Sequence, residues 1–212
     1  MSEGGALRLV EVSPERYPAW RSRYDGANAT KDEPQRIVAV DRFDHDPLGL
    51  VLVRRGGYAV GLVAGGVLVA HKIGTAHVQG RTKKGGWSQQ RYARRRGHQS
   101  DEVVERCRER VVEILLGPSR GSGAGRPRTS TSMGTGGARV RGLGLGGDRA
   151  LIAQLLDDPR LAPLRDLPRR ELYDLPDPTR QVLETALTRT VAVRVSDRFD
   201  VWSACSRACP DM

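Results

Sequence analysis

A pair of glycines followed closely by a pair of glutamines marks the stretch from Gly80 to Gln99. Gly85 and Gly86 carry no side chain, so the backbone there can approach a partner molecule closely. The carboxamide groups of Gln89 and Gln90 both donate and accept hydrogen bonds, so they could orient a water molecule or a nucleic-acid base. These residue types make the stretch the most informative candidate site in the chain.

Positive charge is concentrated around these amides. The chain has a formal net charge of +10, with 35 Lys and Arg residues against 25 Asp and Glu residues, yet no acidic residue lies between Pro47 and Ser100. Such a localised basic region favours a polyanionic partner, above all nucleic acid. The basic residues nearest the glutamines are the candidate RNA contacts: Arg81, Lys83, Lys84, Arg91, Arg94, Arg95 and Arg96.

The spacing of the arginines fits a helix that could bind a phosphate backbone. If residues 88–96 are helical, Arg91, Arg94 and Arg95 share one face at three- and four-residue spacing. The simpler alternative is a solvated basic helix that follows a turn and binds nothing.

The segment KKGGWSQQRYARRR resembles the loop and following helix in the middle domain of class I eukaryotic and archaeal release factors, where a Gly-Gly-Gln turn precedes a Ser-x-x-Arg-aromatic-Ala-Arg helix. It is still more similar to the Vms-like release factors, including their compact actinobacterial branch, in which Gly-x-x-Gln replaces Gly-Gly-Gln. Here the motif reads Gly86, Trp87, Ser88 and Gln89, and residues 91–94 match the helix. Trp87 stands where the release factors carry glutamine, so the acting amide is displaced by two positions to Gln89, with Gln90 as the alternative.

This resemblance implies a ribosome-associated peptidyl-tRNA hydrolase, a release factor that frees nascent chains from stalled ribosomes. The glycine turn would enter the narrow peptidyl-transferase centre, where the Gln89 amide would orient a water on the ester bond. Relatives are also described as cutting the tRNA backbone near its 3′ CCA end, and the sequence leaves both bonds open. The residues implicated in the reaction are Gly85, Gly86 and Gln89, with Trp87, Ser88 and Gln90 as further candidates.

The resemblance also sets expectations for partners and cofactors. A separate codon-reading domain is not recognisable, so the expected activity is independent of the codon. The expected partners are peptidyl-tRNA and the large ribosomal subunit, without a membrane, and neither a cofactor nor a metal is implied. Three cysteines without framework spacing and the lack of a signal-peptide pattern lead us to expect a reduced, cytoplasmic protein, which we take to be a monomer. The alternative function is a non-catalytic RNA- or ribosome-binding module that uses the basic helix at 88–96.

Strands and one long helix must position this site. Apolar segments at 37–40, 48–54 and 58–70 predict extended structure, with a two-residue hairpin turn at Gly65-Gly66 and further alternation from His71 to Gln79. A helix capped by Ser88 is expected to run to about Leu116, with Gly97 as a candidate interruption. Its inner face would consist of Val104, Cys107, Val111 and Leu115, and its outer face of Glu102, Glu105, Arg108, Glu109 and Glu113.

The rest of the chain predicts an α/β pattern. A Gly- and Ser-rich stretch at 117–139 is expected to be a flexible loop. We then expect a strand near 140–145, a helix from Asp148, a loop at 157–168, a strand near 171–173, a helix capped by Asp177 and a strand at 191–195. The predicted fold is a single mixed sheet with helices on both faces. The resemblance to the release-factor middle domain implies that this sheet is RNase H-like. The domain would comprise residues 36–195, between an N-terminal arm at 1–35, with a helix capped by Ser13, and a C-terminal tail at 196–212.

Three weaker signals have simpler explanations. Gly142, Gly144 and Gly147 fit the Gly-x-Gly-x-x-Gly pattern of dinucleotide sites, but a tight strand-to-helix turn explains them better. Cys205 and Cys209 have no histidine nearby in the sequence, so a zinc site is disfavoured. His71 and His77 are expected to be ordinary surface or core residues.

Overall fold

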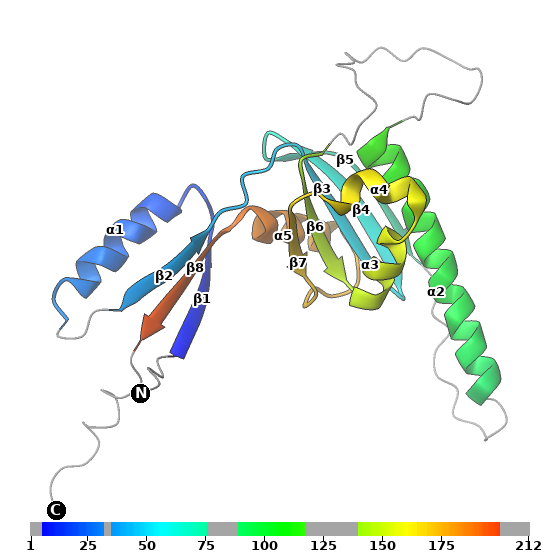
Figure 1. The fold of residues 1–212 in the computed structure, drawn as a ribbon, viewed down its shortest axis with the longest axis horizontal. Helices are drawn as coiled ribbons and strands as arrows, with labels where there is room; N and C mark the ends of the chain where they lie inside the picture. Colours follow the sequence, from blue (N-terminus) through cyan, green and yellow to red (C-terminus); the bar gives the residue numbers. More distant parts are fainter. Residues whose placement is uncertain (1–5, 32–34, 76–88, 118–139, 200–212) are drawn as a thin grey trace, which may run out of the picture. The chain divides into compact units, whose positions relative to one another are not determined.

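The computed structural model describes residues 6–31, 35–75, 89–117 and 140–199, and the chain divides into two compact units (Figure 1). The larger unit comprises His45–Thr190, and the smaller unit joins the segment before His45 to the segment after Thr190. Helices and strands alternate in the way expected for an α/β protein, so the predicted fold class is confirmed.

The larger unit is built on a five-stranded sheet with the order β5-β4-β3-β6-β7. Its strands are β3 (Leu48–Arg54), β4 (Gly57–Ala64), β5 (Val67–Thr75), β6 (Gly142–Gly147) and β7 (Arg169–Leu172). The strands β3, β4 and β5 pair antiparallel, whereas β6 runs parallel to β3 and β7, so the sheet is mixed. Gly65 and Gly66 have φ angles of 59° and 75°, as a type I′ turn requires, which confirms the predicted hairpin.

Helices cover both faces of this sheet (Figure 1). One face packs against α2 (Gln89–Val111), its π-helical continuation η1 (Val112–Leu116) and α3 (Arg149–Leu156), and the other against α5 (Arg180–Val191). Alternation along β3 produces this arrangement, because Val51 and Val53 enter the core beneath α2 while Leu50 points toward α5. The four predicted inner-face residues of the long helix are all fully buried: Val104, Cys107, Val111 and Leu115.

The glycines of β6 allow close packing of the elements around it. A Cβ atom at Gly144 would lie 2.5 Å from Thr190 Oγ1, so α5 fills the space over this strand. Gly147 has a φ of 100°, and a Cβ atom there would lie 2.1 Å from the Val53 carbonyl oxygen. Asp148 then caps α3 by accepting a hydrogen bond from the Ala150 N–H at 3.0 Å. The tight strand-to-helix turn is therefore the correct explanation of this glycine pattern.

Three local predictions in the larger unit need correction. The expected loop at 157–168 contains η2 (Pro159–Leu161) and α4 (Ala162–Arg165). The helix α5 begins at Arg180, and Thr179 caps it by accepting a hydrogen bond from the Val182 N–H at 3.2 Å, while Asp177 lies 3.7 Å from Arg54. The helix α2 passes through Gly97 without a break.

None of the helices in the described part of the chain is long and apolar enough to cross a bilayer.

The smaller unit corrects the prediction that all strands share one sheet. It contains β1 (Ala6–Val12), α1 (Tyr17–Asn28), β2 (Arg36–Asp41) and β8 (Val193–Phe199), and its sheet has the order β1-β8-β2 with antiparallel neighbours. The strands predicted at 37–40 and 191–195 pair with each other here and not with the five-stranded sheet. The first helix begins at Tyr17 and not after Ser13, whose carbonyl oxygen accepts the Tyr17 N–H at 3.0 Å in a preceding turn.

Candidate functional site

The predicted catalytic amides lie at the start of α2. Gln89 and Gln90 are the first two residues of this helix, which confirms the helical prediction from Gln89 onward. Four predicted RNA contacts follow in its next turns: Arg91, Arg94, Arg95 and Arg96. The other candidates lie outside the described residues: Arg81, Lys83, Lys84, Gly85, Gly86, Trp87 and Ser88.

The sequence favours a helix at this point and gives its first turns a positive field. Most of residues 89–96 are Gln, Arg or Ala, which are good helix formers. The first N–H groups of a helix lack intrahelical partners and form the positive end of its dipole. The first turn of α2 contains no acidic residue that would offset this charge. This end of α2 is therefore suited to an anionic partner such as an RNA phosphate.

The half of α2 that carries these residues extends beyond the strands of the sheet (Figure 1). Among the described side chains of α2, burial begins at Val103 and Val104, whereas Asp101 and Glu102 are exposed. With a rise of 1.5 Å per residue, Gln89 lies about 21 Å along the helix axis from Val103. The helix thus carries the amides well away from the core that anchors it.

Apolar side chains anchor the other half of α2. Val104, Cys107 and Val111 belong to the same buried core as Val51 and Val60 of the sheet. Burial raises the pKa of the Cys107 thiol far above its ordinary value. This thiol therefore stays protonated and is no candidate nucleophile.

A row of polar contacts also ties this half of α2 to α3 and η2. We call this set the α2 clamp, and it consists of Asp101, Glu105 and Arg108 on α2 with Gln154, Asp158 and Arg160 beside them. Arg160 donates from Nη2 to Glu105 Oε1 at 2.8 Å, and Gln154 donates from Nε2 to Asp101 Oδ1 at 2.9 Å. Arg108 donates to Glu105 Oε2 and to the Gln154 carbonyl oxygen, both at 2.8 Å. Its Nε lies 3.5 Å from Asp158 Oδ2.

Two carboxylates of the α2 clamp stay ionised well below neutral pH. The side chain and the N–H of Arg160 donate hydrogen bonds to Asp158 and lower its pKa to about 2. The side chains of Arg160 and Arg108 lower the pKa of Glu105 in the same way. The ion pairs that join α2 to η2 are therefore present at neutral pH.

Sequence reasoning missed the α2 clamp. It assigned Glu105 and Arg108 to the outer face of the helix, but the Arg108 side chain is only 17% exposed. The spacing of Asp101, Glu105 and Arg108, at i, i+4 and i+7, was a signal that these side chains share one helix face. Their partners were hidden because Asp158 and Arg160 lie in a segment expected to be a loop.

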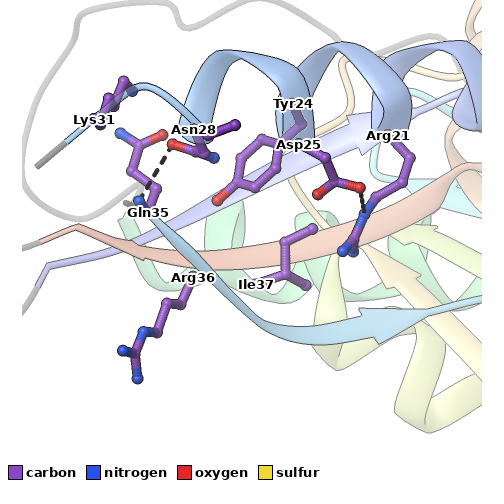
Figure 2. A pocket seen from close by; sticks show the side chains of 9 residues that line it. Arg21, Tyr24, Asp25, Asn28, Lys31, Gln35, Arg36 and Ile37 are labelled. Carbon is purple, nitrogen blue, oxygen red and sulfur yellow. Dashed lines mark hydrogen bonds and ion pairs between the residues drawn. The ribbon is translucent and has the colours of Figure 1, made fainter. Parts of the chain in front are cut away.

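Polar side chains also gather around an open hollow in the smaller unit (Figure 2). It lies beside the C-terminal end of α1 and the start of β2. Arg21 pairs with Asp25 at 2.8 Å, and Asn28 Oδ1 accepts the Gln35 N–H at 3.3 Å. No predicted site residue lines the hollow, so we assign no site to it.

Comparison with known proteins identifies the family. No curated protein matches the chain. The model of the family described as Actinobacteria/chloroflexi VLRF1 release factor matches residues 46–196, which is more than half of the chain. The match runs from the first strand of the five-stranded sheet to β8 and includes the whole of α2 with its amides and arginines. The chain therefore belongs to the actinobacterial and chloroflexi VLRF1 release factors, the branch that its Gly-x-x-Gln motif resembles.

Proposed function

We propose that this protein is a codon-independent peptidyl-tRNA hydrolase that frees nascent chains from stalled ribosomes with its Gly-x-x-Gln motif at residues 86–89. Membership of a release-factor family supports the general role. The observation that carries the specific proposal is that α2 begins at Gln89, the last residue of the motif, and extends from the sheet with four arginines in its first turns.

The proposed chemistry rests on positioning. Gly85 and Gly86 would let the backbone approach the ester, and the Gln89 carboxamide would hold the attacking water near the carbonyl carbon. As the water oxygen bonds to that carbon, the ester bond to the ribose oxygen breaks, and this oxygen takes up a proton. Hydrogen-bond donors at the helix start would stabilise the developing oxyanion. Such a mechanism needs no carboxylate, which fits the lack of acidic residues between Pro47 and Ser100.

The basic residues around the motif would hold the RNA. We assign this role to Arg81, Lys83, Lys84, Arg91, Arg94, Arg95 and Arg96. Phosphate contacts release counterions, so binding should weaken steeply as salt rises. The double variant Arg91→Ala with Arg95→Ala should therefore weaken ribosome binding and flatten its salt dependence.

Three glutamines on the same helix provide the test of catalysis. Gln89→Ala, Gln90→Ala and Gln99→Ala each remove one carboxamide from α2, so they share the change in size and polarity. On ribosomes stalled with labelled peptidyl-tRNA, we expect Gln89→Ala to slow peptide release by about 10²-fold, as the loss of one transition-state group does, while Gln99→Ala changes nothing. A loss with Gln90→Ala instead would identify Gln90 as the acting amide. Release at the full rate by both the Gln89→Ala and Gln90→Ala variants would contradict the catalytic proposal. It would favour the alternative function, a non-catalytic RNA- or ribosome-binding module.

Mass analysis of the released product decides which bond is cut. A free peptide supports ester hydrolysis. A peptide that retains a CCA remnant supports attack of the ribose 2′-hydroxyl on the neighbouring phosphate. The bond from phosphorus to the 5′ oxygen of the remnant would break, this oxygen would take up the proton, and a cyclic phosphate would stay on the tRNA, with Arg91, Arg94 or Arg95 stabilising the charge.

The remaining parts of the proposal concern partner and setting. We propose that the protein acts as a monomer, in the cytoplasm, on peptidyl-tRNA held by the large ribosomal subunit. Complexes stalled with a sense codon or a stop codon in the decoding site should then release peptide at equal rates. A clear preference for stop codons would contradict codon independence.

A further inference from the structure

We propose that the α2 clamp is a positioning device that fixes the direction of α2, so that the residues at its N-terminal end meet the peptidyl-tRNA in one geometry. The inference rests on the proposed function, because it concerns how that site is aimed. Its members touch no substrate and would act only through the helix that they hold.

Apolar packing by itself leaves the direction of α2 loosely determined. The buried side chains of the helix, from Val103 to Leu115, form one stripe against the sheet. Hydrophobic contact is non-directional, so a small sideways rocking of the helix would lose little buried area. Directional contacts on the flank of the helix are needed to fix its angle.

The α2 clamp supplies such contacts along one flank. Asp101 and Arg108 are seven residues apart, so the row covers about 10 Å of the helix. Gln154 engages both ends of the row, since its side chain donates to Asp101 and its carbonyl oxygen accepts from Arg108. Arg160 holds the middle of the row through Glu105. A helix held by one contact can rotate about that contact. Contacts at both ends and in the middle of the row prevent such a rotation of α2.

The length of the free half makes the site sensitive to the angle of α2. Gln89 is sixteen residues from Glu105, which corresponds to about 24 Å along the helix. A tilt of about 2–3° at the α2 clamp would therefore displace Gln89 by about 1 Å, and a displacement of this size can slow a positioned reaction by about 10²-fold. Catalytic geometry is thus sensitive to changes in angle that leave the fold intact.

A matched pair of variants isolates this role. Glu102 and Glu105 are three residues apart on α2 and have exposed fractions of 61% and 45%. Each pairs with an arginine inside the helix, Glu102 with Arg106 and Glu105 with Arg108, but Glu105 also pairs with Arg160 of η2. Glu102→Gln and Glu105→Gln remove the same charge at nearly the same distance from the basic half. Only Glu105→Gln loosens the link between α2 and η2.

The first readout separates positioning from binding. At saturating factor, we expect Glu105→Gln to slow single-turnover peptide release by about tenfold and Glu102→Gln to slow it by less than about twofold, with ribosome affinity unchanged in both. Arg160→Gln should reproduce the loss, and Arg160→Lys, which keeps a positive charge on η2, should recover part of it. Equal release by the two glutamate variants, or a loss confined to affinity, would overturn the inference.

The second readout needs no reaction. Spin labels attached to cysteines introduced by His98→Cys on α2 and Gln181→Cys on α5 report the direction of α2 relative to α5 by pulsed distance measurement. The background carries Cys205→Ser and Cys209→Ser, so that these two thiols are not labelled. We expect a broadened or shifted distribution for Glu105→Gln and an unchanged one for Glu102→Gln. If this difference appears while the unsubstituted protein releases no peptide, the α2 clamp stands and the proposed function fails. If the unsubstituted protein releases peptide and the two distributions are the same, the inference fails and the proposed function stands.

Discussion

The two halves of α2 differ in composition and in surroundings, yet they form one continuous helix. Residues 89–99 contain four arginines and no acidic residue, and they extend beyond the strands (Figure 1). Residues 100–111 mix acidic and basic side chains, bury Val104, Cys107 and Val111, and carry the α2 clamp. The difference shows how a single helix can combine a half anchored in the fold with a basic half that extends beyond it.

The anchored half also explains why the basic half can be helical. Like charges four residues apart, such as Arg91 and Arg95, destabilise an isolated helix. Helices shorter than about 12–15 residues are in any case marginal in water because nucleation is costly. Packing of the second half provides a nucleus, from which the basic half can extend. The composition of residues 89–99 is therefore free to suit the partner.

The largest expected effect on stability tests the anchored half. Leu115 is fully buried where α2 continues into η1. Leu115→Ala leaves a cavity in the core, so the free energy of unfolding should fall by about 2–5 kcal/mol. Arg95→Ala in the basic half should change it by no more than about 0.5 kcal/mol. Urea unfolding of both variants makes the comparison, and similar losses would refute the division of tasks.

A smaller effect, dependent on pH, tests the α2 clamp. The pKa of Asp158 is about 2 in the folded protein against an ordinary 3.8, so its ion pair stabilises the fold at higher pH and is lost as the pH falls through this range. Because this ion pair lies near the surface, where solvent screens it, we expect a contribution of about 1 kcal/mol. Asp158→Asn should lower the free energy of unfolding by this amount at neutral pH and should flatten the loss of stability in acid. Urea unfolding at a series of pH values from neutral to acidic measures the stability and its pH dependence. If the free energy of unfolding of Asp158→Asn falls in acid as steeply as that of the unsubstituted protein, other carboxyl groups cause the acid loss.

The smallest effect is expected from an ion pair that does not leave the helix. Glu102 and Arg106 pair within α2 and both are exposed. Glu102→Gln should lower the free energy of unfolding by only about 0.3–0.5 kcal/mol, which is usual for exposed pairs at this spacing. The same urea assay applies. A loss as large as that of Asp158→Asn would show that an ion pair inside α2 and an ion pair between elements contribute equally to the free energy of unfolding.

Local features of the fold were readable from the sequence. The hairpin at Gly65-Gly66 needs only a turn with two left-handed residues, and the buried stripe from Val104 to Leu115 needs only helical periodicity. The position of the amides at the start of a helix followed in the same way. Each of these depends on neighbours within a few turns of the chain.

Contacts distant in sequence were not readable. Val10 pairs with Val195 across almost the whole chain, and alternation in a strand does not say which strand is its partner, so the separate sheet of the smaller unit was missed. Arg160 was missed as a partner of Glu105 for the same reason, because the short helices of its segment lack a periodic signal. The motif could be found from the sequence, but the contacts that aim it required the structure.

The most direct test of the central claim is the single-turnover rate of peptide release from stalled ribosomes at saturating factor, measured side by side for Gln89→Ala and Gln99→Ala. We predict that the first variant releases peptide about 10²-fold more slowly than the unsubstituted protein although it binds the ribosome equally well, and that the second releases it at the full rate. Equal loss of release in the two variants would contradict the claim that an amide at the first turn of α2 performs the reaction.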